Sequence, residues 1–531
     1  MNFPRKLGVL LIVAAVLAMV SNHFGYALPS LRWLYSFIAT PEQILDAEVK
    51  SYWFGEVNWP WLREHQGDVI GHVLCAVMTL AGVILIVRGK GFHWNPLTIR
   101  KMSRFKSIGR GYSSLKLLIV LIVIALLDQA LVGKQALVVR HDGKWSFPAF
   151  EKRIHLENEY GGESAEEVDF RELKKRFKTD YPDSLIVMPP VPWDQSFDSD
   201  EKVTKDLVLI NGVIHEASGN KPFNGFAVAF QEKNRDLKVR SGRIRNGLLA
   251  GPAQVYDEAG ELAGREEWAG GTRTSTSLKG DPEIVQGRWA QVIYAPLPPD
   301  LKSGHFLGTD SRGWDILAQL YGGMQVLFKA SILYIILTYF FGITMGALMG
   351  YFGGVFDLVM QRVMEIMSNV PSLLVIMIII ANLGRDRVTL GTILLVFCIF
   401  SWIGIATYLR TATFKEKARD YVNAARVIGA PTHRVIFRHI LPNVVATIVT
   451  LIPFSVSSVI TSLTALDFLG FGLPDRYPSW GRLLSDGVSN LSSPWIVSSV
   501  FAMLVLVLLL VTFVGEAIRE AFDPRTFTTY Q

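Results

Sequence analysis

Long apolar runs interrupt the polar sequence of this chain, and several are long enough to cross a lipid bilayer. A run of about 20 apolar residues with few charges predicts a membrane-spanning α-helix, because the hydrocarbon core is roughly 30 Å thick. Eight runs meet this description: Leu7–Phe24, Val69–Val87, Leu115–Val132, Val326–Tyr351, Val363–Ala381, Leu390–Leu409, Val444–Leu466 and Trp495–Gly515. The pattern therefore predicts an all-α polytopic membrane protein with about eight transmembrane helices.

The first run follows Arg5 and Lys6, so a cleaved signal peptide is an alternative to a retained span. The "GYA" that ends at Ala27 is a poor cleavage site, which favours a retained anchor. Under either interpretation the second span starts outside, so the choice leaves the topology unchanged.

Lysine and arginine in the short loops set the orientation, because cytoplasmic loops of membrane proteins are enriched in them. The segment between the second and third spans contains Arg88, Lys90, Arg100, Lys101, Arg104, Lys106 and Arg110 and no acid. The loop after the sixth span contains Arg410, Lys415, Lys417, Arg419, Arg426, Arg434 and Arg438. The loop after the first span is richer in acids: Glu42, Asp46, Glu48, Glu56 and Glu64. These loops predict that both termini are cytoplasmic.

Composition agrees with a membrane protein: half of the 531 residues are hydrophobic and the net charge is +6. The loop bias accounts for that charge, so it indicates no nucleic-acid partner. Cys75 and Cys398 both fall inside predicted spans, which gives neither a disulfide framework nor a metal-ligand spacing.

The spans divide the chain into five regions. These are a two-span hairpin with a basic linker (1–114), the first core span (115–133), an extracytoplasmic segment (134–325), a five-span core (326–515) and a cytoplasmic tail (516–531).

The extracytoplasmic segment has the alternation and turns of β-structure. The residues around Asp142-Gly143 predict a hairpin. Two later stretches, "NGFAVAFQEKNRDLKVRSGRIRNG" and "AGPAQVYDEAGELAGREEWAGG", are weakly self-similar, and each predicts two strands joined by a polar turn. They resemble the hairpin repeats of MORN-like modules, and an irregular β subdomain is the alternative. His155 and His215 lack a catalytic spacing and are expected to be solvated.

A polar helix-turn-helix, "EKARDYVNAARVIGAPTHRVIFRHILPN" (Glu416–Asn443), interrupts the membrane domain. Helical spacing predicts a narrow face made by Ala418, Tyr421, Val422, Ala425 and Ile428. Gly429 is expected to end the first helix in a left-handed conformation, and Pro431 to start the second. The second helix has Val435, Ile436 and Ile440 on one side and Arg434 and Arg438 on another.

Two other functions compete for this element. Ala425, Gly429 and Val435 fit the spacing of a DNA-binding helix-turn-helix. Arg410 leaves one span and Pro442 enters the next, however, so the element lies against lipid headgroups and cannot enter a major groove. A simple amphipathic interfacial loop is the better alternative, although it explains neither the paired small residues nor the Leu-Pro exit.

"YVNAARVIGAPTHRVIFRHILPN" resembles the EAA loop of ABC-importer permeases, whose short coupling helix docks into a groove of the ATP-binding subunit. The chain departs from that pattern at Asn423 and His439. The resemblance implies the following docking residues: Tyr421, Ala424, Ala425, Arg426, Gly429, Arg438, Leu441 and Pro442.

Further stretches resemble the dipeptide/oligopeptide branch of these permeases. They are "HFLGTDSRGWDILAQLYGG", "GYFGGVFDLVMQRVMEIMSNVPSLL", "TSLTALDFLGFGLPDRYPSWGRLLSDG" and "GEAIREAFDPR". "GRGYSSLKLLIVLIVIALLDQALVGKQALVVRHDGKWSFPAF" is similar to the start of the E subunit of microcin C / Yej-type peptide permeases. The resemblance implies a type I importer fold with a MetI-like core in the bacterial inner membrane. It also implies three kinds of partner: a second permease subunit, ATP-binding cassette subunits and a periplasmic substrate-binding protein.

The chain has no G-x-x-x-x-G-K-[ST] phosphate loop. We therefore expect no catalytic residues and no directly bound cofactor or metal, with ATP used by partner subunits.

Polar residues inside spans are candidates for the translocation path, since such residues tend to face a bundle interior or a cavity. The candidates are Asp128, Asn369, Pro371, Ser462 and Thr464. Helix–helix packing is the alternative role for each of them.

The sequence as a whole predicts the permease subunit of an ATP-driven importer for peptides or peptide-like compounds. Three alternatives stay open: an importer for another cargo such as nickel or a glycopeptide, a membrane-anchored sensor whose β segment binds an outside ligand, and a scaffold with a vestigial core.

Overall fold

The computed structural model describes residues 3–29, 31–35, 66–88, 96–161, 168–181, 184–194, 203–210, 212–215, 221–223, 225–231, 237–257, 262–278, 287–293, 296–301, 304–383, 388–474 and 477–522. The acid-rich loop after the first span and the end of the C-terminal tail lie outside these residues. The chain forms two compact units. The first contains residues 1–198, 298–308 and 314–531, and the second contains 199–297 and 309–313.

The first unit begins with a helical hairpin of α1 (Phe3–His23) and α5 (Gln66–Arg88). Their backbones lie very close at Gly8 and Gly82: a Cβ on Gly8 would lie 2.6 Å from the carbonyl oxygen of Gly82. Small residues permit such close approach between membrane helices. The amphipathic helix α6 (Pro96–Ser107) follows and leads into α7 (Gly109–Leu126).

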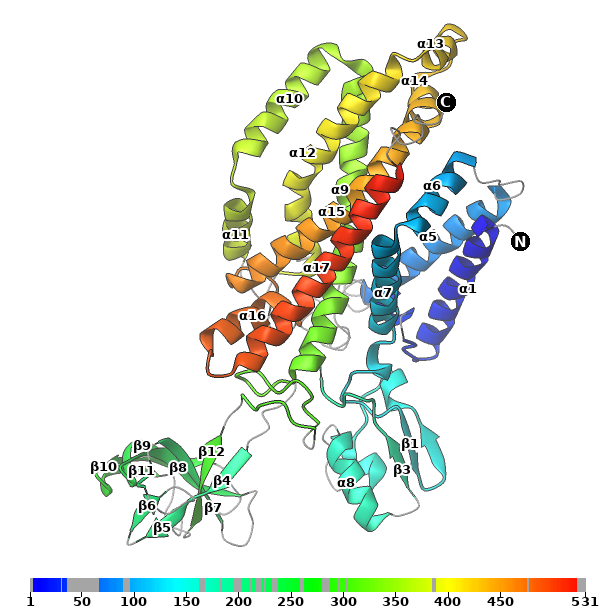
Figure 1. Cartoon of the computed structure of the whole chain (residues 1–531). Helices are drawn as coiled ribbons and strands as arrows, with labels where there is room; N and C mark the ends of the chain where they lie inside the picture. Colours follow the sequence, from blue (N-terminus) through cyan, green and yellow to red (C-terminus); the bar gives the residue numbers. More distant parts are fainter. Residues whose placement is uncertain are drawn as a thin grey trace. The chain divides into compact units, whose positions relative to one another are not determined.

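The remaining helices of this unit make the core of the membrane domain (Figure 1). They are α9 (Ile316–Phe352), α10 (Gly354–Asn369), α11 (Ser372–Leu383), α12 (Leu390–Lys417), α15 (Leu441–Phe468), α16 (Trp480–Ser489) and α17 (Pro494–Phe522). The fold is thus mainly helical, as the hydropathy predicts.

The predicted count of eight spans is not confirmed. In the described part of the chain, six helices are long and apolar enough to cross a membrane, and a seventh span requires that α10 and α11 be counted together. That pair, over the predicted span Val363–Ala381, is bent by 75°. Pro371 lies at the break, where it cannot continue the backbone hydrogen bonds of a helix. The second predicted span, Val69–Val87, lies within α5, whose stretch Gly71–Val87 is apolar.

Two other boundaries differ. The third predicted span ends early, because α7 stops at Leu126 and a 3₁₀ turn follows at Asp128–Ala130. The fourth begins early: α9 starts at Ile316, ten residues before the predicted Val326. Its start is fixed by Asp315, whose Oδ1 accepts a hydrogen bond from the Ala318 N–H at 2.8 Å.

A stripe of glycines packs α9 against α12. A Cβ added to Gly342, Gly346 or Gly350 would lie within 2.7 Å of an α12 atom, the carbonyl oxygens of Ala406 and Arg410 among the nearest. The two helices therefore touch backbone to backbone along this stripe, and nothing larger than glycine fits there without moving one of them.

Residues 136–188 of the first unit form a small α/β subdomain. Strands β1 (Val138–His141), β2 (Lys144–Ser146) and β3 (Leu185–Val187) pair in the order β2-β1-β3, with α8 (Phe170–Asp180) beside them. The predicted hairpin at Asp142-Gly143 is confirmed, and both turn residues have positive φ, +48° and +74°.

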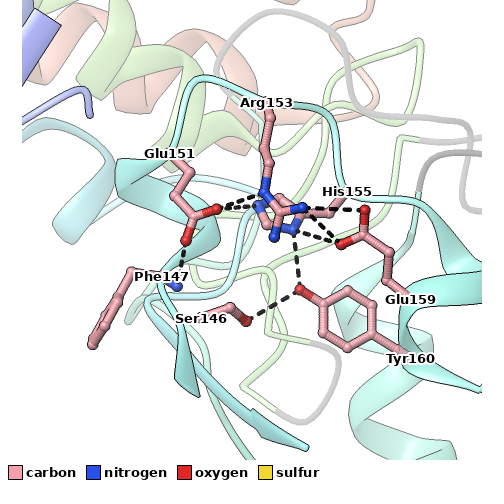
Figure 2. Close-up of polar contacts among 7 residues, drawn as sticks. All are labelled: Ser146, Phe147, Glu151, Arg153, His155, Glu159 and Tyr160. Atoms are coloured by element: carbon pink, nitrogen blue, oxygen red, sulfur yellow. Dashed lines mark hydrogen bonds and ion pairs between the residues drawn. The ribbon is translucent and has the colours of Figure 1, made fainter. Parts of the chain in front are cut away.

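Figure 2 shows a polar cluster within this subdomain. His155 is 1% exposed, and its Nδ1 lies 3.1 Å from the hydroxyl of Tyr160. Its two ring nitrogens also lie 3.4 and 3.5 Å from the carboxylates of Glu151 and Glu159, and both of these glutamates contact Arg153. The expectation that His155 is solvated is therefore wrong: the residue holds together the loop that crosses the strands.

One of the sequence signatures forms the joint at the start of α9. His305 is buried and its Nδ1 lies 2.9 Å from Oδ2 of Asp315, the carboxylate that caps α9. The imidazole stacks on the ring of Trp193, with ring centroids 4.0 Å apart. The guanidinium of Arg171, in α8, lies 4.3 Å from the centre of the Trp193 ring. The "HFLGTDSRGWD" motif thus connects the α/β subdomain to the first core helix.

The second unit is built on a seven-stranded antiparallel sheet with the order β11-β10-β9-β8-β7-β12-β4. The strands are β4 (Val203–Asp206), β7 (Gly225–Gln231), β8 (Lys238–Arg245), β9 (Leu248–Tyr256), β10 (Leu262–Ala269), β11 (Thr272–Leu278) and β12 (Gly287–Ile293). The two self-similar stretches form successive hairpins, β7–β8 and β9–β10, as predicted. A separate pair, β5 (Val208–Ile210) and β6 (Val213–His215), completes the unit.

Candidate coupling loop and cavity

The helix-turn-helix lies between two long core helices. It consists of α13 (Asp420–Val427), α14 (Thr432–Arg434) and a π-helical turn, Val435–Ile440, which continues directly into α15. α12 enters it at Lys417. The element, called the coupling loop below, thus comprises two short helices, as the sequence predicts.

The turn has the glycine geometry expected from the sequence. Gly429 has a φ of +83°, its N–H donates to the Arg426 carbonyl at 3.0 Å, and the Ala430 N–H donates to the Ala425 carbonyl at 3.0 Å. These two bonds make a Schellman motif, which satisfies the last carbonyls of α13. A residue with a Cβ would be strained at this φ, so Gly429 fixes the direction in which the loop turns.

The inner side of the coupling loop is apolar and fully buried. Val422, Val435 and Ile440 are each inaccessible to solvent, and they pack in one cluster with Leu409 of α12 and Tyr351 of α9. Three buried aliphatic side chains contribute roughly 5 to 9 kcal/mol to this packing. The coupling loop is therefore packed against the ends of both helices.

Polar contacts reinforce this attachment. Lys417 donates to the carbonyl of Tyr351, and the cations of Lys417 and Arg426 lie 5.6 and 5.5 Å from the centre of its ring. On the other side, the Asn443 amide donates to the hydroxyl of Tyr421 at 2.9 Å and to the His439 carbonyl at 2.8 Å. His439, which departs from the family pattern, takes part here through its backbone.

The outer side presents two aliphatic side chains to solvent. Val427 is 87% exposed and Ile428 is 85% exposed. On the narrow face expected from helical spacing, Val422 is buried and Ala425 half-buried, whereas Ala418, Tyr421 and Ile428 are exposed. Ile428 directly follows the last residue of α13. Sequence reasoning also missed Val427; two aliphatic residues directly before a C-capping glycine are the signal that could have identified the pair.

The docking residues implied by the family resemblance divide by exposure. Tyr421, Ala424, Arg426, Gly429, Arg438 and Pro442 are exposed, and Ala425 and Leu441 are half-buried. The exposed members surround Val427 and Ile428 in the sequence.

A cavity of about 920 Å³ lies between the broken span and α12. Met367, Ser368, Val370, Ser372, Phe400, Ile403, Gly404, Thr407, Tyr408, Thr411, Ala412 and Lys415 line it. The predicted Asn369 and Pro371 are exposed at the break, and their neighbours line the cavity in their place. Thr407, Thr411 and Lys415 were missed, although polar residues four apart on an apolar helix indicate such a face.

An ion pair joins α10 to α12 beside this cavity. The Nη2 of Arg410 donates to Oδ2 of Asp357 at 2.6 Å, Nε of the same guanidinium donates to Oδ1, and Asp357 is buried. A bidentate pair of this kind fixes orientation as well as distance. The start of the broken span is therefore fixed to the segment of α12 that enters the coupling loop.

The other candidate path residues lie elsewhere. Asp128 is 1% exposed, with a φ of +50°, and forms an ion pair with Arg32. The Gln325 amide also donates to its Oδ1 at 3.3 Å. Because Asp128 is enclosed by these groups, it joins the N-terminal hairpin to α9 and does not line the cavity. Ser462 is half-buried and Thr464 buried, and neither lines the cavity.

The chain matches known transport proteins over most of its length. Residues 342–528 match the family described as binding-protein-dependent transport system inner membrane component. The chain is 29% identical to the peptidoglycan transport system permease protein YejE of Agrobacterium fabrum over 448 residues, which cover 84% of this chain and 97% of that protein.

Two further relatives come from Escherichia coli K12. The inner membrane ABC transporter permease protein YejE is 27% identical over 432 residues, which cover 81% of this chain and 98% of the relative. The oligopeptide transport system permease protein OppC is 34% identical over 241 residues, which cover 45% of this chain and 77% of the relative. This chain therefore belongs to the family of inner-membrane ABC permeases for binding-protein-dependent transport, in the branch of the YejE and oligopeptide permeases.

Proposed function

We propose that this chain is one of two permease subunits in an ATP-driven importer for peptides or peptide-like compounds. The assembly would contain a second permease subunit, ATP-binding subunits on the cytoplasmic side and a periplasmic substrate-binding protein. Both termini and the coupling loop would face the cytoplasm, in agreement with the basic loops. The chain itself would bind no ATP and catalyse no reaction.

The exposed pair Val427 and Ile428 carries the proposal. Two aliphatic side chains more than four-fifths exposed, on a basic loop that also exposes Phe437, are the arrangement of a small apolar anchor that a partner covers. The family membership supports an ATP-binding subunit as that partner. Burial of the pair would contribute roughly 3 to 5 kcal/mol to association.

The packing supports transmission of movement from the coupling loop to the membrane-spanning helices. Closure of the ATP-binding subunits would displace the loop, and the buried contacts of Val422 and Val435 oppose any movement of the loop alone. α12 would therefore move with it and change the cavity, since Thr407, Thr411 and Lys415 of this helix line the cavity wall. Coupling of this kind requires one element whose two arrangements both sites influence.

The names of the relatives support a peptide-like cargo. Peptidoglycan transport is named for the A. fabrum protein and oligopeptide transport for the OppC proteins. Apolar side chains such as Met367, Phe400 and Ile403 line the cavity together with hydroxyl groups and Lys415. This mixture suits cargoes with peptide bonds, such as microcin C-like peptides and murein-derived peptides, because hydroxyls donate to and accept from peptide groups.

The test replaces both exposed aliphatic residues by aspartate, V427D/I428D, in the full transporter. Co-purification of the ATP-binding subunit and uptake of a labelled oligopeptide are both measured. We expect association with the ATP-binding subunit to weaken by at least 100-fold and uptake to be lost. The permease should still insert in the membrane, because both side chains are exposed and their replacement does not disturb the fold.

The matched control is Leu491→Asp. Leu491 is 72% exposed and lies between α16 and α17, at the opposite end of α15 from the coupling loop. This variant should retain association and uptake. Retained association of V427D/I428D with the ATP-binding subunit would refute the docking role. A wild-type transporter that binds the ATP-binding subunit but takes up no peptide would leave the docking role intact and refute the cargo.

A further inference from the structure

The helix α6 has an unusual combination of charge and exposed apolar surface. Between Asp68 and Asp128 the sequence contains no acidic residue, and in that interval α6 and the start of α7 hold Arg100, Lys101, Arg104, Lys106, Arg110 and Lys116. α6 is amphipathic along its twelve residues. It lies outside residues 342–528, which match the permease family.

The packing of α6 places it at the coupling end of the membrane domain. α15 leaves the coupling loop at Leu441 and crosses to the other side, and α17 returns, so that Phe522 ends on the side of the loop. Phe105 of α6 packs on Ala517 and Ala521 near this end, and the Lys101 amine lies 4.8 Å from the centre of the Phe522 ring. α6 therefore lies at the membrane surface that the basic loops assign to the cytoplasm.

The opposite face of α6 is not covered by the described part of the chain. Ile99 is 55% exposed and Met102 is 50% exposed. They lie three residues apart, and Lys106, also exposed, lies four residues beyond Met102, so that all three share one side of the helix. Exposed Arg100 flanks this side. Exposed apolar side chains beside long cationic ones on the same side of a helix are the pattern of a helix that lies in the interface of a membrane.

Neighbouring acids do not cancel this charge. On the α17 segment beside α6, Glu516 lies 3.8 Å from Arg110, where both side chains are largely exposed, and Glu520 is accompanied by Arg519. Within the described residues no salt bridge involves Arg100 or Lys106. The surface therefore keeps a positive excess on the side where Ile99 and Met102 are exposed.

We infer that α6 binds the headgroups of anionic phospholipids in the cytoplasmic leaflet, with Arg100 and Lys106 on the phosphates and Ile99 and Met102 inserted at the acyl boundary. Anionic lipid is favoured over a soluble acidic protein because α6 leads directly into α7, a helix long and apolar enough to span the membrane, so lipid lies beside it. A bound lipid would stabilise the position of α6, and through the contacts of Phe105 that of the end of α17. The inference is independent of the cargo.

The test measures the affinity of the purified full-length chain, in neutral detergent, for dioctanoyl phosphatidylglycerol and dioctanoyl phosphatidylcholine by microscale thermophoresis. The wild-type chain should prefer phosphatidylglycerol. Each basic side chain near an anionic surface contributes roughly a factor of five to affinity, so R100Q/K106Q should bind phosphatidylglycerol about 30-fold more weakly. Its affinity for phosphatidylcholine should not change.

Two controls keep the result specific. K174Q/K178Q removes the same charge from exposed positions of α8, which lies beyond the other end of α7, and should bind like wild type. R100K/K106R retains the charge and should also bind like wild type, which separates loss of charge from loss of fold. I99S/M102S should lower the affinity for both lipids.

Three results would overturn the inference: equal affinity of wild type for both lipids, an equal loss of affinity in K174Q/K178Q, or displacement of phosphatidylglycerol by inorganic phosphate but not by sodium chloride of the same ionic strength. The last would show a site for a free anion.

Discussion

Gly346 lies at the middle of the glycine stripe between α9 and α12, and enlarging it tests whether these two helices must stay in contact for transport. A Cβ at this residue would lie 2.5 Å from the carbonyl oxygen of Ala406 and 2.9 Å from Cβ of Leu409. Ordinary van der Waals contact begins near 3.4 Å, so the helices must separate by about 0.9 Å at this point (3.4 − 2.5). The neighbouring glycines, with contacts of 2.7 and 2.5 Å, prevent a compensating slide.

Two effects of Gly346→Ala oppose each other. Replacing glycine by alanine inside a helix stabilises it by up to about 1 kcal/mol. Overpacking of a tight interface costs about 1 to 3 kcal/mol. The clash involves backbone on one side, which cannot rotate away, so the cost is expected at the upper end and the net destabilisation of Gly346→Ala at about 1 to 2 kcal/mol. Gly346→Leu should exceed this.

Gly404 of α12 provides the matched control, since a Cβ there would meet no atom within 4 Å. Gly404→Ala should leave stability unchanged or slightly raised. Thermal unfolding of the purified transporter and substrate-stimulated ATP hydrolysis are measured for both variants. We expect Gly346→Ala to lower the unfolding temperature and to uncouple hydrolysis from uptake, because α12 leads straight into the coupling loop. Unchanged unfolding and coupling in both Gly346→Ala and Gly346→Leu would refute the close-packing argument.

Two further predictions concern buried charges outside the cavity. Asp128→Ala should destabilise the chain by about 3 to 5 kcal/mol, measured by thermal unfolding, because the guanidinium of Arg32 stays buried without the Asp128 carboxylate. The double variant Arg32→Ala/Asp128→Ala should recover part of this loss. Equal losses of stability in the single and double variants would contradict the prediction. Burial, together with the charge of Arg153, lowers the pKa of His155 below its usual 6.5, so the unfolded chain binds a proton that the folded chain does not. The contribution of His155 to the stability of the α/β subdomain is therefore fully present above pH 6.5 and should be lost as the pH drops below it. Limited proteolysis of residues 136–188 at pH 7.5 and 5.5 measures this change. His155→Gln should reduce the pH dependence of stability, and an unchanged pH dependence would contradict the role of His155.

Hydropathy and turn chemistry predicted the parts of this fold that depend on local sequence. The apolar runs located the helices, Asp142-Gly143 located a hairpin, and Gly429 located the end of α13, because each depends on a few adjacent residues. Helix boundaries set by tertiary contacts were missed. α9 extends to Ile316 because Asp315 caps it and His305 holds that carboxylate, contacts that no window of hydropathy registers.

The site was predicted less completely, for the same physical reason. Periodicity grouped Ile428 with Val422 on one helix face, because it registers spacing and not burial. In the structure Val422 is buried, whereas Ile428 follows the end of α13 and is exposed. Asp128 was chosen as a polar residue in an apolar run, but its partner Arg32 is far away in the sequence, so its burial in an ion pair could not be inferred. The cavity itself arises from a 75° bend at Pro371, and the size of that bend depends on packing.

α12 unites these observations. Three glycines of α9 contact the backbone of α12 directly. The hydroxyl groups of Thr407 and Thr411 and the amine of Lys415, all on α12, line the cavity, and α12 ends at the coupling loop. Arg410 also ties it to Asp357 at the start of the broken span. Under the proposed docking, a displacement of Val427 and Ile428 would therefore move α12 and, through the glycine contacts, α9 with it. The break at Pro371 lies between Val370 and Ser372, which line the cavity, so it is the place where such a movement would change the cavity.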